Sequence, residues 1–364
     1  MSTEDLTLED VRARAKEKLK GFCMVYKDCD GSPSRFCQGQ HYGRSLGIGG
    51  MGSGASFHNN WLALRKLQLK TKLISEHFEP DTTFTCFGKQ LSMPIMAASV
   101  AGVNSFGGEK VITEREFCQA TVQGCNEAGT IAWRGDTYTY SIDESPGLDA
   151  IAQGNNGGVK IVKPRTQQEI IRFFKKAEKC DVSAVGVDVD GCGSYMMRKH
   201  NKKVFRKTQA DIRELVTSTS LPVVVKGIMC AEDAVLAAEA GAAAIVISNH
   251  GGRVLDSTPG AADILEEIVE AVAATNVMVL ADGGIRTGYD VLKMLALGAK
   301  AVLVGRDIVR AAVGAGSYGV RLQIEYLQKT LAKAMLMTGC KSLSEISSDI
   351  VLRSQTEESK VVEG

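Results

Sequence analysis

The chain has 364 residues and a formal net charge of +1, from 43 Lys and Arg against 42 Asp and Glu. This balance gives no bulk electrostatic reason to bind nucleic acid or an anionic membrane, and we expect neither as a partner. The acidic N-terminus lacks the apolar core of a signal peptide and no segment reads as a membrane span, so we expect a soluble, cytoplasmic protein. Ten cysteines fit reduced thiols better than a disulfide framework.

Residues 1–90 are predicted to form a helical and glycine-rich extension that packs on the rest of the chain. Its Cys23, Cys29 and Cys37 are separated by six and eight positions, which matches no standard zinc or iron–sulfur pattern, so we expect loop cysteines and no metal site. The glycine-rich run at 43–54 is either a flexible cover over a ligand or a plain loop.

Residues 91–364 are predicted to form one domain, in which short apolar runs alternate with amphipathic stretches. The predicted strands lie at 94–99, 129–134, 158–163, 184–190, 222–228, 243–249, 277–281 and 301–304. The predicted helices lie at 112–127, 166–179, 208–219, 231–240, 260–274, 287–297 and 316–337. Eight such repeats predict an α/β fold, a (β/α)8 TIM barrel, with a doubly wound open sheet as the alternative.

Three polar motifs follow predicted strands, at the end where barrel enzymes place their catalytic groups. Ser248-Asn249-His250-Gly251-Gly252-Arg253 follows the sixth strand and offers a base beside a cation. Asp282-Gly283-Gly284-Ile285-Arg286 and Gly305-Arg306 follow the seventh and eighth strands, and their glycines and arginines suit a phosphate. Lys226 lies inside the apolar fifth strand, where a lone ammonium needs a partner. Each feature alone is more often structural, but together on one face they indicate a site.

These motifs resemble those of the FMN-dependent α-hydroxy acid oxidases and dehydrogenases, which include glycolate oxidase and lactate oxidase. The resemblance runs from about Leu91 to Ile346 and is strongest around the motifs just described. It implies that His250 is the active-site base, that Asp190 orients it, and that Arg253 clamps the substrate carboxylate. It also implies a set of FMN-binding residues: Ala98, Ser99, Lys160, Asp188, Lys226, Ser248, Asp282, Gly283, Gly284, Arg286, Gly305 and Arg306.

Within that set, the resemblance gives individual roles. Lys226 would lie against the N1/O2 edge of the flavin, and the backbone at Ala98 and Ser99 would pass near N5. The loops that hold Asp282 and Gly305, with both of their arginines, would hold the ribityl phosphate.

The chain departs from the family pattern on the substrate side. Alignment of the third strand puts Val162 where the family has a tyrosine that bonds the substrate hydroxyl, and Lys160 where it has a glutamine. Asp188 replaces a threonine and Gly193 replaces a second substrate arginine, while Gly135 stands at a common serine position. We expect Lys160 and Asp188 to form an ion pair under the flavin.

The resemblance implies an FMN-dependent oxidoreductase that oxidises a 2-hydroxy acid or a related carboxylate. The alternatives are a reduced-flavin enzyme resembling type 2 isopentenyl diphosphate isomerase, or a flavin-binding protein without catalysis. Tyr26, His41 or Tyr42 is a candidate for the missing substrate contact, and the basic segment 192–207 is either a lid or a solvated loop. The electron acceptor is not identified, and we expect a homo-oligomer, a tetramer by analogy with the family.

Overall fold

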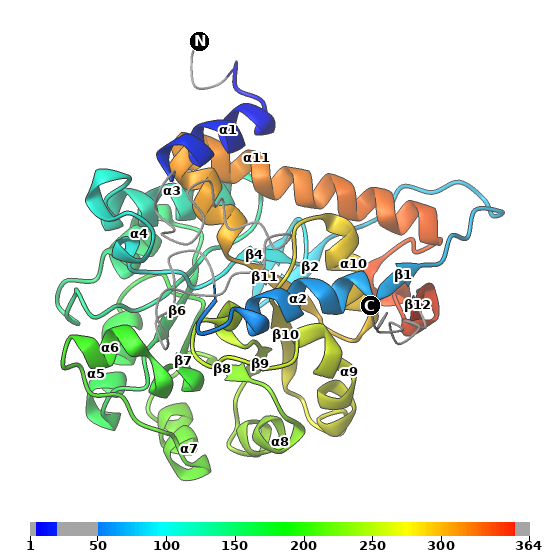
Figure 1. Ribbon diagram of the computed structural model, residues 1–364. Coiled ribbons are helices and arrows are strands. Elements are labelled where there is room, and N and C mark those ends of the chain that lie inside the picture. Colours follow the sequence, from blue (N-terminus) through cyan, green and yellow to red (C-terminus); the bar gives the residue numbers. More distant parts are fainter. Residues whose placement is uncertain (1–4, 20–49, 354–364) are drawn as a thin grey trace, which may run out of the picture.

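The computed structural model describes residues 5–19 and 50–353, and its centre is a ring of eight parallel strands (Figure 1). In ring order from β4 the sheet runs β4-β11-β10-β9-β8-β7-β6-β5. A parallel bridge between Ala97 and Ala132 joins the two ends of this order. An open doubly wound sheet has two free edges, so this closure confirms the (β/α)8 barrel and excludes the alternative.

The eight predicted strands are all present, although most are shorter than predicted. Their bounds are β4 (Ile95–Ala97), β5 (Trp133–Arg134), β6 (Val159–Val162), β7 (Ala184–Asp188), β8 (Val223–Ile228), β9 (Ala244–Ile247), β10 (Met278–Asp282) and β11 (Ala301–Val304). Both faces of this sheet are covered, which is why the strands read as nearly continuous apolar runs.

Helices connect and surround these strands, as predicted, and two more helices come from the first ninety residues. Their bounds are α1 (Leu8–Lys18), α2 (Ala55–Arg65), α3 (Glu114–Glu127), α4 (Pro146–Gly154), α5 (Gln167–Ala177), α6 (Tyr195–Lys199), α7 (Gln209–Thr217), α8 (Ala231–Glu239), α9 (Ala261–Ala271), α10 (Gly288–Ala296) and α11 (Arg306–Thr338). Helix α11 has a break at Ala315 and Gly316, so the helix predicted from residue 316 is its second part.

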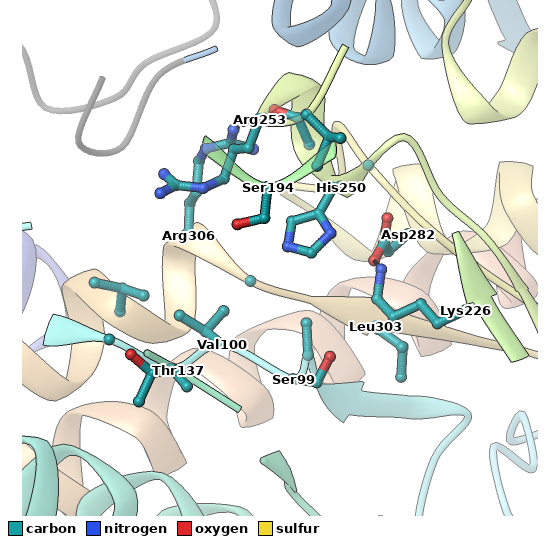
Figure 2. Close-up of a pocket in the computed structure, with 18 of the residues that line it drawn as sticks. Ser99, Val100, Thr137, Ser194, Lys226, His250, Arg253, Asp282, Leu303 and Arg306 are labelled. Carbon is teal, nitrogen blue, oxygen red and sulfur yellow. Dashed lines mark hydrogen bonds and ion pairs between the residues drawn. The ribbon is translucent and has the colours of Figure 1, made fainter. Parts of the chain in front are cut away.

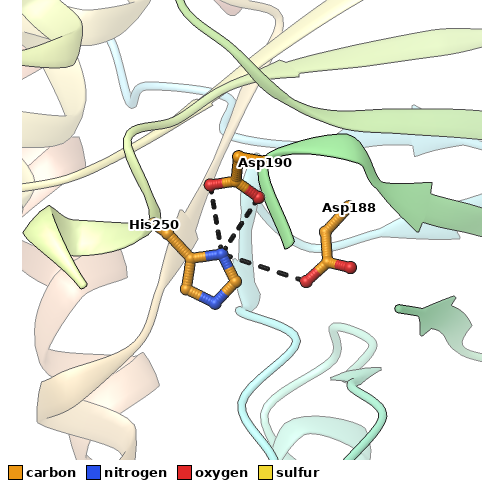
Figure 3. A group of neighbouring side chains, drawn as sticks. All are labelled: Asp188, Asp190 and His250. Atoms are coloured by element: carbon orange, nitrogen blue, oxygen red, sulfur yellow. Dashed lines mark hydrogen bonds and ion pairs between the residues drawn. The ribbon is translucent and has the colours of Figure 1, made fainter. Parts of the chain in front are cut away.

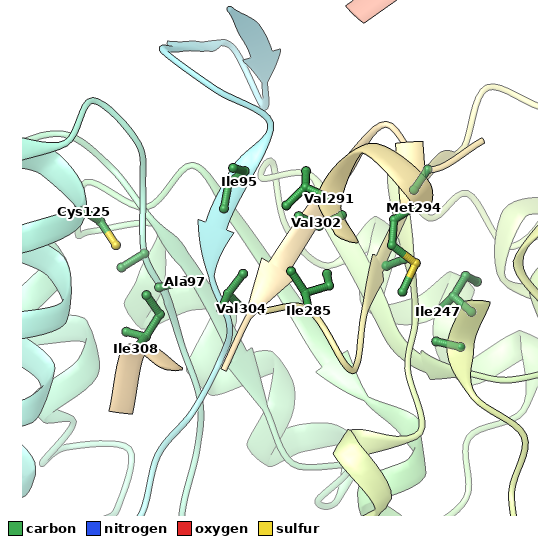
Figure 4. Close-up of a cluster of buried hydrophobic side chains, with 14 of the residues drawn as sticks. Ile95, Ala97, Cys125, Ile247, Ile285, Val291, Met294, Val302, Val304 and Ile308 are labelled. Atoms are coloured by element: carbon green, nitrogen blue, oxygen red, sulfur yellow. The ribbon is translucent and has the colours of Figure 1, made fainter. Parts of the chain in front are cut away.

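Side chains that alternate along the strands form two separate apolar layers. Inward-facing residues such as Val159, Ile161 and Leu303 fill the barrel. Outward-facing residues meet the helices, and Figure 4 shows Ala97 and Val304 of neighbouring strands lying beside Ile308 of α11. This alternation decides which polar side chains at the strand ends face the barrel axis.

Two short antiparallel sheets complete the fold. The hairpin of β2 (Phe84–Cys86) and β3 (Lys89–Leu91) precedes β4, and its Cys86 and Leu91 pack with the inward-facing residues. Strand β1 (Leu67–Leu69) pairs with β12 (Val351–Arg353), which joins the segment after α2 to the C-terminal end of the described chain. No helix within the described residues has both the length and the apolar character needed to cross a membrane.

Candidate active site

An open cavity of about 1370 Å³ lies at the carboxyl ends of the barrel strands (Figure 2). Most of the predicted site residues line it: Ala98, Ser99, Lys226, His250, Arg253, Asp282, Gly283, Gly284, Arg286, Gly305 and Arg306. The motifs that follow β9, β10 and β11 therefore meet around one cavity, as the barrel fold predicts. Asp188, Asp190 and Ser248 lie directly behind this lining, whereas Lys160 does not.

His250 is held by carboxylates that follow β7 (Figure 3). Its Nδ1 lies 3.2 Å from both carboxylate oxygens of Asp190 and 3.9 Å from Oδ2 of Asp188. Burial by itself raises the pKa of Asp190, but the charges of His250 and Lys226 outweigh it and hold that pKa below its usual range. An ionised Asp190 fixes the imidazole orientation and leaves Nε2 as the ring nitrogen that no carboxylate in the described part of the chain engages.

The loop after β9 has an unusual backbone, with left-handed φ values of 56°, 63° and 77° at His250, Gly251 and Gly252. A Cβ at Gly251 would lie 2.6 Å from Nη1 of Arg306, and one at Gly252 would lie 2.5 Å from the backbone nitrogen of Phe57. Gly252 is therefore required by close packing against backbone as well as by φ, whereas a Cβ at Gly251 would displace the Arg306 guanidinium. His250 adopts this conformation with a side chain, which is a form of strain often found at functional sites.

Lys226 is almost completely buried at the floor of the cavity and is compensated by an acid. Its ammonium lies 2.9 Å from Oδ2 of Asp282 and donates a 2.5 Å hydrogen bond to Oγ of Ser248. Burial alone lowers the pKa of Lys226, but Asp282 and Asp190 raise it above its usual value, so the lysine stays charged. We therefore assign the Asp282 side chain to Lys226 and not to a phosphate, which a carboxylate repels.

The predicted ion pair between Lys160 and Asp188 is wrong, and Lys160 does not line the cavity. Lys160 and Val162 belong to the outward face of β6, because Val159 and Ile161 face inward. The Lys160 ammonium donates to the carbonyl of Gly135, and it lies 6.0 Å from the Phe173 ring centroid, in the layer between sheet and helices. Neighbouring residues of a strand point to opposite faces, so Lys160 and Val162 lie on the face of β6 opposite to the one expected for them.

Lys163, which the sequence analysis did not select, occupies the cavity instead. It continues the inward alternation of β6 and lines the cavity, and its ammonium lies 2.5 Å from Oδ2 of Asp188. Burial raises the pKa of Asp188, and Lys163 opposes that effect. Asp188, Asp190 and His250 hold ligand-type atoms within 4.8 Å of one another, but Lys163 already supplies the positive charge that a cation would bring to Asp188.

The arginines of the last two loops are held in place by neighbouring groups. Arg286 lies 3.3 Å from Oδ1 of Asp307, which also contacts Arg310. Arg306 donates to the carbonyl of Gly251, and its guanidinium lies 4.5 Å from the ring centroid of Phe57. Both arginines line the cavity beside the start of α11, where a helix N-terminus and two guanidinium groups favour a phosphate.

Helix α2 shapes these loops, and the sequence analysis did not predict it. A Cβ at Gly283 or Gly284, which have φ values of 104° and 78°, would lie 2.5 Å or 2.2 Å from oxygens of Asn60. The Asn60 amide also donates a 2.7 Å hydrogen bond to Oδ1 of Asn249. One buried asparagine thus ties together two of the predicted motifs.

Two observations fit a bound FMN. Oδ1 of Asp282 is buried and has no hydrogen-bond partner in the described part of the chain, so it can accept a bond from a ribityl hydroxyl. Gly305 has an ordinary backbone, and a Cβ there would meet only Val100 and Ala98, at 3.7 Å and 3.8 Å. Packing does not require glycine at this position, which is the pattern expected where a ligand approaches the backbone closely.

The structure describes some of the other positions at which the chain departs from the family pattern, and others lie outside the described residues. A Cβ at Gly135 would lie 2.3 Å from the carbonyl oxygen of Ser99, so no side chain fits there in this conformation. The segment after β7 forms α6, and its residues 194–197 line the cavity. The cysteines at 23, 29 and 37, the candidates Tyr26, His41 and Tyr42, and most of the glycine-rich run lie outside the described residues.

Comparison with known proteins agrees with this geometry. The family model described as FMN-dependent dehydrogenase matches residues 45–207 and 193–353. Glycolate oxidase of Spinacia oleracea is 32% identical, with 78% of this chain and 84% of that protein covered. The 4-hydroxymandelate oxidase of Amycolatopsis orientalis is 32% identical, with 81% and 89% covered.

Solved structures give the same result. A mandelate oxidase variant with an FMN adduct is 32% identical, with a TM-score of 0.68 over 81% of this chain and 90% of that chain. A structure described as a lactate oxidase of Pediococcus acidilactici is 25% identical, with a TM-score of 0.77 over 96% and 94%. The chain therefore belongs to the FMN-dependent dehydrogenase family, whose members include the α-hydroxy acid oxidases, and its cofactor is FMN.

Proposed function

We propose that this enzyme oxidises a 2-hydroxy acid or a closely related carboxylate, with His250 as base and Arg253 as carboxylate clamp. The observation that carries the proposal is the held imidazole: Asp190 engages Nδ1, and His250 lines the same cavity as Arg253 and Lys226. The related proteins named above act on glycolate and 4-hydroxymandelate, which are small 2-hydroxy acids.

The arrangement suits the chemistry of the reaction. Oxidation of a 2-hydroxy acid to a 2-oxo acid removes two electrons and two protons, and bound FMN supplies the two-electron acceptor. Nε2 of His250 takes a proton from the substrate, and ionised Asp190 stabilises the imidazolium that forms. Arg253 has the planar guanidinium that pairs with a carboxylate through two parallel hydrogen bonds, which fixes the substrate beside the base.

The charged groups at the cavity floor support a position for the cofactor in this scheme. Lys226 would meet the polar edge of the flavin, where a cation favours negative charge on the reduced ring. Asp282 and Ser248 would keep that lysine in position. The loop glycines, Arg286 and Arg306 would hold the phosphate.

The test is an anaerobic titration of the FMN-loaded enzyme with glycolate, lactate, mandelate and longer 2-hydroxy acids, followed by flavin absorbance. At least one acid is expected to bleach the flavin, and His250→Ala is expected to slow that step by about 10²–10⁴-fold because proton transfer is lost. His77→Ala is the matched control, since His77 is largely exposed, lies outside the cavity lining and bonds Glu79. A bound flavin that none of these acids reduces contradicts the proposal.

A further inference from the structure

Lys163 is the one lysine at the third strand that faces the reaction cavity, and the reaction scheme above does not use it. Its position follows from the strand: Val159 and Ile161 point into the barrel, so residue 163 is the next inward position. The Lys163 side chain is 13% exposed and lines the cavity. Because so little of this side chain is exposed, the groups available to it are those of the cavity floor and of a ligand bound in the cavity.

The ammonium of Lys163 has hydrogen-bonding capacity that residues 5–19 and 50–353 do not use. It carries three protons, and within the described residues its side chain has one partner, Oδ2 of Asp188, at 2.5 Å. The same oxygen lies 3.9 Å from Nδ1 of His250. The lysine and the base therefore flank the same part of the cavity.

The Lys163–Asp188 pair has no net charge, and this limits the class of ligand group that it binds. Asp188 neutralises Lys163, so the pair as a whole does not attract a second anionic group. What it offers is a charge-assisted N–H donor, which suits an oxygen that is neutral or only partly charged. A substrate held by Arg253 through its carboxylate carries such an oxygen on the neighbouring carbon, the carbon that is oxidised.

We propose that Lys163 binds the oxygen on the carbon being oxidised, and that Asp188 holds the ammonium in place for it. This rests on the proposed function. The ammonium donates a hydrogen bond to the hydroxyl oxygen of the substrate and to the keto oxygen of the product. Lys163 thereby selects acids that carry an oxygen at this carbon.

The experiment compares two ligands that differ in that oxygen alone, such as pyruvate and propionate. Each is titrated into the oxidised FMN enzyme, and the change in the flavin absorbance spectrum gives its dissociation constant. In Lys163→Met, pyruvate is expected to bind about tenfold more weakly or worse, and propionate less than about threefold more weakly, because only pyruvate loses a charge-assisted hydrogen bond. Equal weakening of both ligands, or of neither, overturns the proposal.

Two further variants serve as controls for this experiment. Lys160→Met removes the lysine on the opposite face of the same strand, and the ratio of the two affinities is expected to stay at its wild-type value. The double variant Lys163→Met with Asp188→Asn leaves no unpaired charge in the site, and it is expected to show the same selective loss of pyruvate binding. Selective binding that survives in the double variant overturns the proposal.

The result can be separated from the proposed function. Flavin reduction of the wild-type enzyme by a 2-hydroxy acid tests the reaction, whereas the ratio of the pyruvate and propionate affinities tests Lys163. An enzyme that lactate reduces, and whose affinity ratio does not change in Lys163→Met, keeps the reaction and loses this role for the lysine.

Discussion

Charged side chains at the cavity floor form ion pairs, and the sequence analysis had selected at least one residue of each pair. Lys226 was selected because a lysine in an apolar strand needs a partner, and the structure supplies Asp282 at 2.9 Å. Asp188 was selected from the family pattern, but its partner is Lys163 and not Lys160. Sequence reasoning therefore located the groups that need compensation, and the fold was required to show which group compensates them.

The Lys226–Asp282 pair makes a testable contribution to stability. Lys226→Met is expected to lower the unfolding free energy of the FMN-free protein by about 3–5 kcal/mol, because it leaves a buried carboxylate without its cation. The double variant with Asp282→Asn removes both charges, so its stability is expected to lie much closer to wild type. Denaturant unfolding of the three proteins measures this, and a double variant as unstable as Lys226→Met would contradict the explanation.

At the scale of elements, the sequence predicted the barrel well because its repeat is regular. All eight strands lie where buried apolar runs were found, and glycines at 129, 241 and 298 have the left-handed φ expected just after a helix. Helix α4 was missed, since Pro146–Gly154 is short and interrupts a long polar connection. The register of β6 was misassigned because a strand buried on both faces shows no alternation to read.

Helix α2 is a second element whose contacts the sequence did not predict. Its contacts with the loops after β9 and β10 join residues that are about two hundred positions apart, such as Asn60 and Asn249. Nothing in the local pattern of residues 55–65 signals that pairing. The glycines at 283 and 284 were selected for a phosphate, and the structure adds a second reason for them, because a Cβ at either position would meet Asn60 of α2.

The junctions of strands with helices allow a direct test of the phosphate loops. Gly305→Ala is expected to leave the stability of the FMN-free protein within about 1 kcal/mol of wild type, because the added Cβ has room and the backbone is ordinary. The same variant is expected to weaken FMN binding about tenfold or more, since the Cβ occupies the side of the cavity that Val100 and Ala98 also line.

Gly284→Ala is the matched comparison for that test. Here the Cβ would lie 2.2 Å from the Asn60 carbonyl oxygen and φ is 78°, so the FMN-free protein itself is expected to lose about 1–3 kcal/mol. Unfolding of both FMN-free variants and fluorescence titration with FMN separate the two effects. If Gly305→Ala bound FMN as tightly as wild type, Gly305 would not be part of the cradle.

At the scale of the whole molecule, the loop that follows β1 exposes apolar side chains that contacts within the single chain do not explain. Figure 1 shows it extending beyond the end of α11. Hydrogen bonds from Lys70 to the Ile350 carbonyl and from Lys72 to the Met337 carbonyl hold its base. Further out, Leu73 is 59% exposed and Ile74 fully so. Exposed apolar side chains on a projecting loop are typical of a protein–protein contact.

We therefore predict that this loop contributes to association of the chain with itself, the homo-oligomer expected from the sequence. Light scattering after size exclusion is expected to give a mass that is a multiple of 39.0 kDa for the wild type. Leu73→Glu combined with Ile74→Glu is expected to lower that mass, because burying two carboxylates in an apolar contact costs several kcal/mol.

Leu236→Glu on α8, where the leucine is 44% exposed, is the control and is expected to leave the mass unchanged. FMN content is expected to stay at the wild-type level in both variants, since none of these residues lines the cavity. A wild-type mass of one chain, or a mass that the loop variant does not lower, would show that the loop has another role.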